Sequence, residues 1–257
     1  MSSEKRFEFS KDNIDTYLKE VAKEYRRRVG KCMPAELILI GGASVLINYS
    51  FRNMTTDIDA LIQAASAMQD AINCVRDHNR LSNNWLNMDF KKTDSYSPKL
   101  PQFSVYYKTF SNVVTVRTVN AEYLVAMKLR SGRQYKSDLS DILGILSEHE
   151  QRGIPITMKQ IRRAVTDLYG DWDILPQTSQ MFIENVMRDG HFRDLYNQVT
   201  NGEKETRKML IQFEQDYPDI IKAANLEGII ENLQKKADKA SILAELRKKK
   251  EETDRNA

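Results

Sequence analysis

Asp57 and Asp59 lie on either side of Ile58, in a stretch whose apolar pattern predicts a β-strand. Alternate side chains of a strand point to the same face, so both carboxylates would face one way while Ile58 enters the core. Two carboxylates about 4 Å apart repel by about 4 kcal/mol at an effective dielectric constant of about 20. A bound cation or protonation of one acid would relieve this repulsion, unless both acids simply face water at a strand end.

A glycine pair precedes these acids. Residues 37–40 are apolar and indicate a buried strand, Gly41 and Gly42 indicate a turn, and residues 43–49 indicate a short helix. Glycine lets backbone N–H groups approach phosphate oxygens closely, although a tight strand-to-helix turn alone would also explain the pair. Ser44, at the start of the helix, would either contact a phosphate or cap the helix.

Several charged and polar side chains elsewhere need partners. Lys128 lies on an otherwise apolar helix face, so its ammonium requires a phosphate, a carboxylate or open solvent. Asp138 and Asp141 have the spacing of a helix N-terminal cap. Arg52 and Thr55 precede the aspartate pair and would either contact phosphate or hold the loop.

The composition is that of an ordinary globular protein. The chain has 257 residues, 29% charged and 41% apolar, and a net charge of +3 that does not by itself indicate a nucleic-acid partner. Cys32 and Cys74 lack metal-binding spacing and indicate reduced thiols. Without an apolar run near the about 20 residues of a membrane span, or an apolar secretion signal, we expect a cytoplasmic protein with no membrane partner.

The expected elements divide the chain into two parts. Strand patterns are confined to the first half, with 103–107 and 113–119 as the last two strands. Later segments predict helices only, at 157–169, 178–187, 191–199, 204–215 and 227–252. We therefore expect an α+β protein, with a small mixed β-sheet domain over residues 1–150 and an all-helical region with a charged C-terminal helix over 151–257.

The order of a glycine pair at a strand end, a short helix and Asp-x-Asp on the next strand resembles the signature of the DNA polymerase β-type nucleotidyltransferase superfamily. Four further segments make the chain similar to bacterial AbiEii-type and related minimal nucleotidyltransferases. These segments are Phe51–Asp59, Trp85–Asn87, Tyr123–Leu129 and Gly132–Asp141.

The resemblance implies a cofactor, a substrate and a set of site residues. Asp57 and Asp59 would bind Mg²⁺ or Mn²⁺ and align the α-phosphate of a nucleoside triphosphate (NTP), and Lys128 would offset charge on the leaving pyrophosphate. Further nucleotide contacts would come from Gly41, Gly42, Ser44, Arg52, Thr55, Arg133 and Asp138.

One feature departs from the superfamily pattern, which commonly has a third carboxylate on a later strand. The expected strand 113–119 contains no acid, and the candidates are Asp89, Glu122, Asp138 and Asp141. The site would therefore hold one fully coordinated metal, take a third ligand from elsewhere, or bind nucleotide without turnover.

The expected function is metal-dependent transfer of a nucleotide from an NTP to an RNA (tRNA-like) or protein acceptor. The resemblance implies a toxin of a toxin–antitoxin or phage-defence system, with an antitoxin partner, and the basic pair at 162–163 would suit RNA. The alternative is a catalytically degenerate protein of this fold that acts as a nucleotide- or partner-binding module.

Overall fold

The computed structural model describes residues 7–132 and 137–218, together with 220–222, 225–226, 228–233 and 235. The chain forms two compact units: the first comprises Met1–Gly132 and Asp138–Tyr196, and the second comprises Arg133–Ser137 and Asn197–Ala257. This division differs from the expected boundary at residue 150, because the helices up to Tyr196 belong to the same unit as the sheet.

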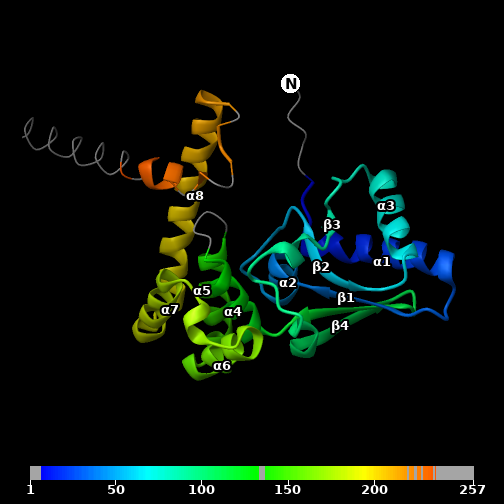
Figure 1. Ribbon diagram of the computed structural model, residues 1–257, viewed down its shortest axis with the longest axis horizontal. Helices are drawn as coiled ribbons and strands as arrows, with labels where there is room; N and C mark the ends of the chain where they lie inside the picture. Colours follow the sequence, from blue (N-terminus) through cyan, green and yellow to red (C-terminus); the bar gives the residue numbers. More distant parts are fainter. Residues whose placement is uncertain are drawn as a thin grey trace, which may run out of the picture. The chain divides into compact units, whose positions relative to one another are not determined.

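A mixed five-stranded sheet forms the centre of the first unit (Figure 1). Its order is β3 (Leu86–Asn87), β2 (Ile58–Gln63), β1 (Ala35–Leu39), β5 (Val114–Val119) and β4 (Ser104–Phe110). The β1–β5 and β2–β3 pairs are parallel, and the β1–β2 and β4–β5 pairs are antiparallel. The expected mixed sheet is confirmed, and it contains a short edge strand, β3, that the sequence pattern did not indicate.

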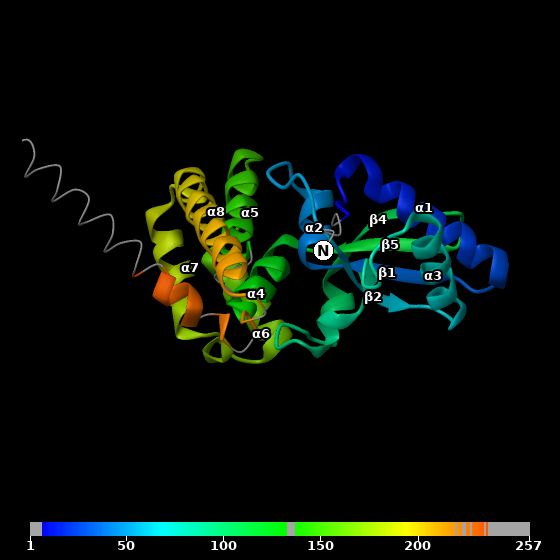
Figure 2. The same ribbon diagram turned by 90° about the horizontal axis from the view of Figure 1, so that it is seen from above.

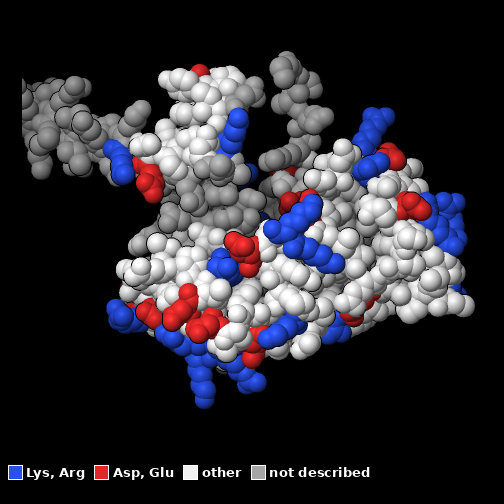
Figure 3. Space-filling view, viewed as in Figure 1, with Lys and Arg blue, Asp and Glu red and all other residues white. Residues whose placement is uncertain are grey.

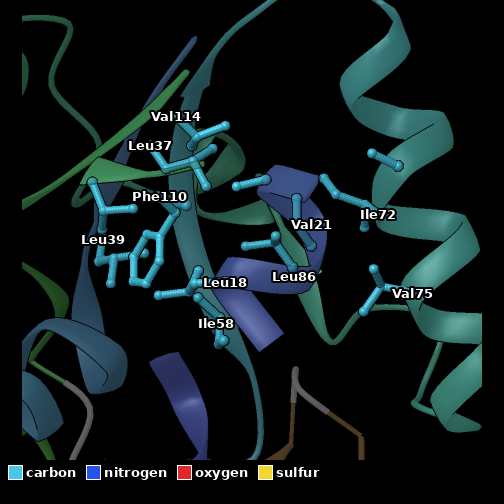
Figure 4. Packing of buried hydrophobic residues seen from close by; sticks show 14 of the residues in the cluster. Leu18, Val21, Leu37, Leu39, Ile58, Ile72, Val75, Leu86, Phe110 and Val114 are labelled. Carbon is cyan, nitrogen blue, oxygen red and sulfur yellow. The ribbon is translucent and has the colours of Figure 1, made fainter. Parts of the chain in front are cut away.

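Helices α1 (Lys11–Val29) and α3 (Ala67–Asn79) pack against each other and cover one face of this sheet (Figures 1 and 2). Their apolar residues recur every three or four positions and so form one buried stripe on each helix. Figure 4 shows these stripes meeting the inward side chains of the strands. The labelled members of this core include Leu18, Val21, Leu37, Leu39, Ile58, Ile72, Val75 and Leu86.

The remaining helices of the first unit follow the strands. Helix α2 (Gly41–Asn48) begins directly after β1, and α4 (Ala121–Ser131) follows β5. Helix α4 contacts three later helices, which are α5 (Asp138–Gln151), α6 (Met158–Tyr169) and α7 (Gln177–Asp189). Short 3₁₀ turns lie at Asp89–Lys92, Leu100–Phe103 and Trp172–Ile174.

The last described long helix corrects one expectation. Helix α8 (Phe192–Asp216) is continuous, whereas we expected two helices with a break near Gly202. A single glycine costs a helix only about 1 kcal/mol, so it need not interrupt the apolar pattern on both sides. Most of the expected helix 227–252 lies outside the described residues. No helix in the described part of the chain is both long and apolar enough to cross a membrane.

Helix α5 anchors the loop that leads to the aspartate pair. The Glu148 carboxylate accepts hydrogen bonds from the Ser50 backbone N–H (2.5 Å), the Ser50 hydroxyl (2.7 Å) and the Phe51 N–H (3.0 Å). One turn earlier, a Cβ on Gly144 would lie 2.6 Å from the Phe51 ring, so only glycine allows this ring to approach the helix. The loop is therefore attached to α5 by both hydrogen bonds and close packing.

This anchor predicts a pH-dependent contribution to stability. Burial alone would raise the pKa of Glu148, but hydrogen bonds from Ser50 and Phe51 and the charge of Arg152 outweigh it and lower this pKa below 4.5. A carboxylate whose pKa is lower in the folded than in the unfolded state stabilises the protein at pH values above its unfolded-state pKa. This stabilisation is lost as the pH falls through the folded-state pKa. We expect Glu148→Gln to lower the free energy of unfolding by about 2 kcal/mol at pH 7.

Denaturant unfolding between pH 7 and pH 3 measures this effect. The difference between wild type and Glu148→Gln should shrink as the carboxylate becomes protonated, and the exposed Glu150→Gln variant should match wild type throughout. A difference that stays constant down to pH 3 would contradict the assigned role of the Glu148 charge.

Candidate functional site

The glycine turn lies beside Asp59 because β1 and β2 are antiparallel neighbours. Leu39 pairs with Ala60, and the Ile40 N–H donates to the Asp59 carbonyl at 3.0 Å, so the end of β1 meets the start of β2. Gly41 has a φ of +54°, in the left-handed region that favours glycine. A Cβ on Gly41 would lie 3.4 Å from Asp59 Oδ2. The N-terminus of α2 thus faces a carboxylate of the predicted pair.

The aspartate pair has the alternation expected from the sequence. Ile58 is fully buried, whereas Asp57 is exposed and Asp59 is half-buried. Asp57 immediately precedes β2, and Asp59 is its second residue. The two carboxylates therefore flank a core residue at the edge of the sheet where the glycine turn lies.

Arg52 and Thr55 pack against the second glycine. A Cβ on Gly42 would lie 2.8 Å from Thr55 Oγ1 and 3.0 Å from Arg52 Nη2, so any larger residue would displace these side chains. Thr55 Oγ1 donates to the Asp57 carbonyl at 3.1 Å, and Thr55 also forms a backbone bridge with Phe9. Thr55 therefore fixes the backbone beside the acid pair.

Four charged residues form a buried network next to this turn. Lys128 Nζ lies 2.9 Å from Asp138 Oδ1 and 2.7 Å from Asp141 Oδ2, and Arg52 Nη1 lies 2.5 Å from the same Asp141 oxygen. The side chains of Lys128, Asp138 and Asp141 are only 8%, 5% and 4% exposed. Two cations thus contact two anions where an unpaired charge would be costly.

The partners of Lys128 are carboxylates of the protein itself. Burial alone would lower the pKa of Lys128, but the charges of Asp138 and Asp141 outweigh burial and raise it above the ordinary value, so Lys128 stays an ammonium ion. Asp138 and Asp141, which have the spacing of a helix cap, lie in the first turn of α5, and both accept from this ammonium. Sequence reasoning missed the contact between Asp141 and Arg52, although the spacing of Asp138 and Asp141 places both on one helix face.

The four candidates for a third carboxylate do not complete a three-acid cluster. Asp89 is exposed and pairs with Lys92 at 2.8 Å, Asp138 and Asp141 contact Lys128, and Glu122 lies in the first turn of α4. Within the described residues, no three His, Cys, Asp or Glu side chains are placed to hold one metal ion. Asp57 and Asp59 are therefore the acids that the described structure offers at the glycine turn.

Ser44 does not join this arrangement, and Arg133 cannot be placed in it. Ser44 is fully buried in α2, and its hydroxyl has no hydrogen-bond partner, so it is shielded from any ligand in this conformation. Arg133 lies outside the described residues. The residues that meet at one place are Gly41, Gly42, Arg52, Thr55, Asp59, Lys128, Asp138 and Asp141, with Asp57 adjoining Asp59.

The network predicts a large effect of removing its central cation. Lys128→Met would leave Asp138 and Asp141 buried with one cation fewer, and we expect the free energy of unfolding to fall by about 3 kcal/mol. Lys92→Met removes the exposed pair with Asp89 and is the matched control, expected to have little effect. Urea unfolding of both variants checks this, and equal losses would contradict a special role of the buried network.

A family model described as "Nucleotidyltransferase of unknown function (DUF6036)" matches residues 12–148. The match covers more than half of the chain and includes all five strands, the glycine turn, the aspartate pair and the buried network. The narrower likeness to AbiEii-type proteins stays a prediction. No curated protein and no solved structure matches the chain. By its sequence match, the chain belongs to this nucleotidyltransferase family.

Proposed function

We propose that the protein transfers a nucleotide from a nucleoside triphosphate to an acceptor hydroxyl, in a reaction that depends on Mg²⁺ or Mn²⁺. The observation that best supports this function is the glycine turn at the N-terminus of α2, which lies against Asp59. Backbone N–H groups at a helix N-terminus attract phosphate, and the adjacent carboxylates attract a divalent cation. Groups that would bind the phosphates and groups that would bind the metal ion therefore lie at one edge of the sheet.

The two acids fit the needs of magnesium. Mg²⁺ commonly uses one or two protein carboxylates and completes its coordination with water and substrate phosphates. Asp57 and Asp59 would hold the ion, and Asp57 is exposed enough to meet it from solvent. When bound, the ion supplies charge neutralisation for the reacting phosphate.

The chain's own residues would position the reactants. The acceptor oxygen forms a bond to the α-phosphorus as the bond from that phosphorus to pyrophosphate breaks, and the hydroxyl proton passes to solvent. The N–H groups of the glycine turn and the guanidinium of Arg52, next to Gly42, would bind phosphate oxygens. Because Lys128 already contacts two carboxylates, we assign it a positioning role through Asp141 and Arg52 in place of direct contact with pyrophosphate.

The acceptor and the physiological role belong to this proposal as well. From the resemblance we propose an RNA (tRNA-like) or protein acceptor, and a toxin that is controlled by an antitoxin partner. The expected RNA contact at Arg162 and Arg163 has weak support, because Arg162 pairs with Glu184 and Arg163 lies near Asp167. Figure 3 likewise shows basic and acidic side chains interspersed on the face that it presents.

A second candidate is a protein of this fold that binds nucleotide without turning it over. The observation that favours it is the two-acid site, since no third carboxylate joins Asp57 and Asp59 among the described residues. Calorimetry with NTP, in the presence and absence of Mg²⁺, distinguishes the two functions when combined with product analysis. Binding without product would favour the second candidate.

Labelled nucleotide transfer tests the proposed activity. Purified protein with Mg²⁺ or Mn²⁺ and each α-labelled NTP should label an RNA or a protein from a cell extract, and the class that is labelled identifies the acceptor. We expect Asp57→Asn and Asp59→Asn each to reduce labelling by at least about 100-fold, because the metal site would lose charge. Asp89→Asn, in an exposed pair outside the site, is the control and should retain activity.

Two results would contradict this activity. One is the absence of labelling with every NTP and both metals. The other is labelling that Asp57→Asn and Asp59→Asn leave unchanged while the variants remain folded.

A further inference from the structure

The backbone around Asp57 is hydrogen-bonded on both sides to segments that are distant in the sequence. Phe9 and Thr55 form an antiparallel bridge, in which the Phe9 N–H donates to the Thr55 carbonyl at 2.7 Å and the Thr55 N–H donates to the Phe9 carbonyl at 2.8 Å. On the other side, the Ile58 N–H donates to the Trp85 carbonyl at 2.7 Å. Asp57 therefore lies between two backbone attachments, one to Phe9 and one to Trp85.

The peptide bond that follows Asp57 has both of its polar groups occupied. Its carbonyl, which belongs to Asp57, accepts from Thr55 Oγ1 at 3.1 Å, and its N–H, which belongs to Ile58, donates to Trp85. The Asp57 side chain is exposed, so its position depends mainly on the backbone that carries it. Holding this peptide bond in place therefore restricts where the carboxylate can lie.

The side chains of Phe9 and Trp85 connect the two attachments. Their rings stack with centroids 5.9 Å apart and planes 28° apart, and Tyr17 of α1 meets both rings edge-on. Phe9 and Trp85 are fully buried, and Phe9 directly precedes Ser10, the N-cap of α1. Contacts between buried rings in these orientations are favourable. The ring contact therefore connects the N-terminus of α1 to the segment before β3, and residues 55–58 are bonded to both.

The Trp85 indole acts here as an apolar ring. Its buried N–H has no hydrogen-bond partner among the residues that the structure describes. A buried N–H without a partner costs free energy, so hydrogen bonding by the indole does not explain a tryptophan at this position. Its contribution is burial and the ring contact with Phe9.

We infer that Phe9 and Trp85 are positioning residues for Asp57: their stacked rings hold together the two backbone attachments that fix the Asp57 peptide. The segment before α1 thereby helps to direct this carboxylate toward the metal. Both side chains are fully buried, so they act through the backbone of residues 55–58. This inference rests on the proposed function, because that function assigns the metal to Asp57.

Amide hydrogen exchange, resolved to single residues, tests the two attachments without any ligand. In the wild-type chain we expect the Thr55 and Ile58 amides to exchange within about tenfold of the rates in β1, because exchange requires the attachments to open. In Phe9→Ala both amides should exchange at least about tenfold faster relative to β1. Unprotected Thr55 and Ile58 amides in the wild type would overturn the inference, even if no variant folds.

Nucleotide transfer, measured per folded protein, tests the positioning role. Phe9→Ala and Trp85→Ala should each lower the rate of labelling at least about tenfold and raise the Mg²⁺ concentration for half-maximal labelling, because a misplaced carboxylate weakens the metal site. Trp85→Phe should restore most of the rate, since it keeps an aromatic ring next to Phe9 and loses no hydrogen bond within the described structure.

Ile72→Ala is the matched control, since Ile72 is buried in the same apolar core but belongs to α3. It should lower stability as other large-to-small core substitutions do, yet keep the labelling rate and the Mg²⁺ requirement within about twofold of wild type. Equal losses of rate in Ile72→Ala and Phe9→Ala would overturn the inference. So would an unchanged Mg²⁺ requirement in both Phe9→Ala and Trp85→Ala.

The exchange and transfer measurements separate this inference from the proposed function. A wild-type chain that shows the expected protection but transfers no nucleotide with either metal refutes the proposed function, and the role of Phe9 and Trp85 toward the metal falls with it. A wild-type chain that transfers nucleotide, with a Phe9→Ala variant that keeps the same rate and Mg²⁺ requirement, refutes only the positioning role.

Discussion

A single carboxylate oxygen, Oδ2 of Asp141, accepts from two cations that come from distant parts of the chain. Lys128 reaches it from α4 and Arg52 reaches it from the loop before β2. Asp138 is the second anion of this buried network, so the loss of any one charge would leave its partners poorly compensated. The position of Arg52 beside the glycine turn depends on this interaction, which links α5 to the edge of the sheet.

Close packing restricts the same region to a few residue types. Gly42 leaves room for Thr55 and Arg52, and Gly144 leaves room for the ring of Phe51. These glycines let loop side chains approach two different helices, α2 and α5. The loop before the aspartate pair is therefore held on two sides, which limits the freedom of Asp57 and Asp59 before any ligand binds.

The metal site proposed for this protein would have two carboxylate ligands from the chain, one fewer than a three-acid site. With two carboxylates at the glycine turn among the described residues, much of the negative charge around the metal would come from the triphosphate itself. Metal binding and nucleotide binding would then be coupled, since each brings the charge that the other needs. Tight metal binding would then require the bound triphosphate.

The sequence by itself determined the α+β class, most helices and strands, and the glycine–aspartate pattern, because these depend on local periodicity and on residues close together in the chain. It did not determine the partners of Lys128, the continuity of α8 or the short strand β3. The partners of Lys128 and the strand β3 depend on contacts between separate segments: Asp141 meets Arg52 across 89 positions, and Asn87 meets Asp59 only through strand register. Pairing and burial, which arise only when the chain folds, brought Asp138 and Asp141 into contact with Lys128.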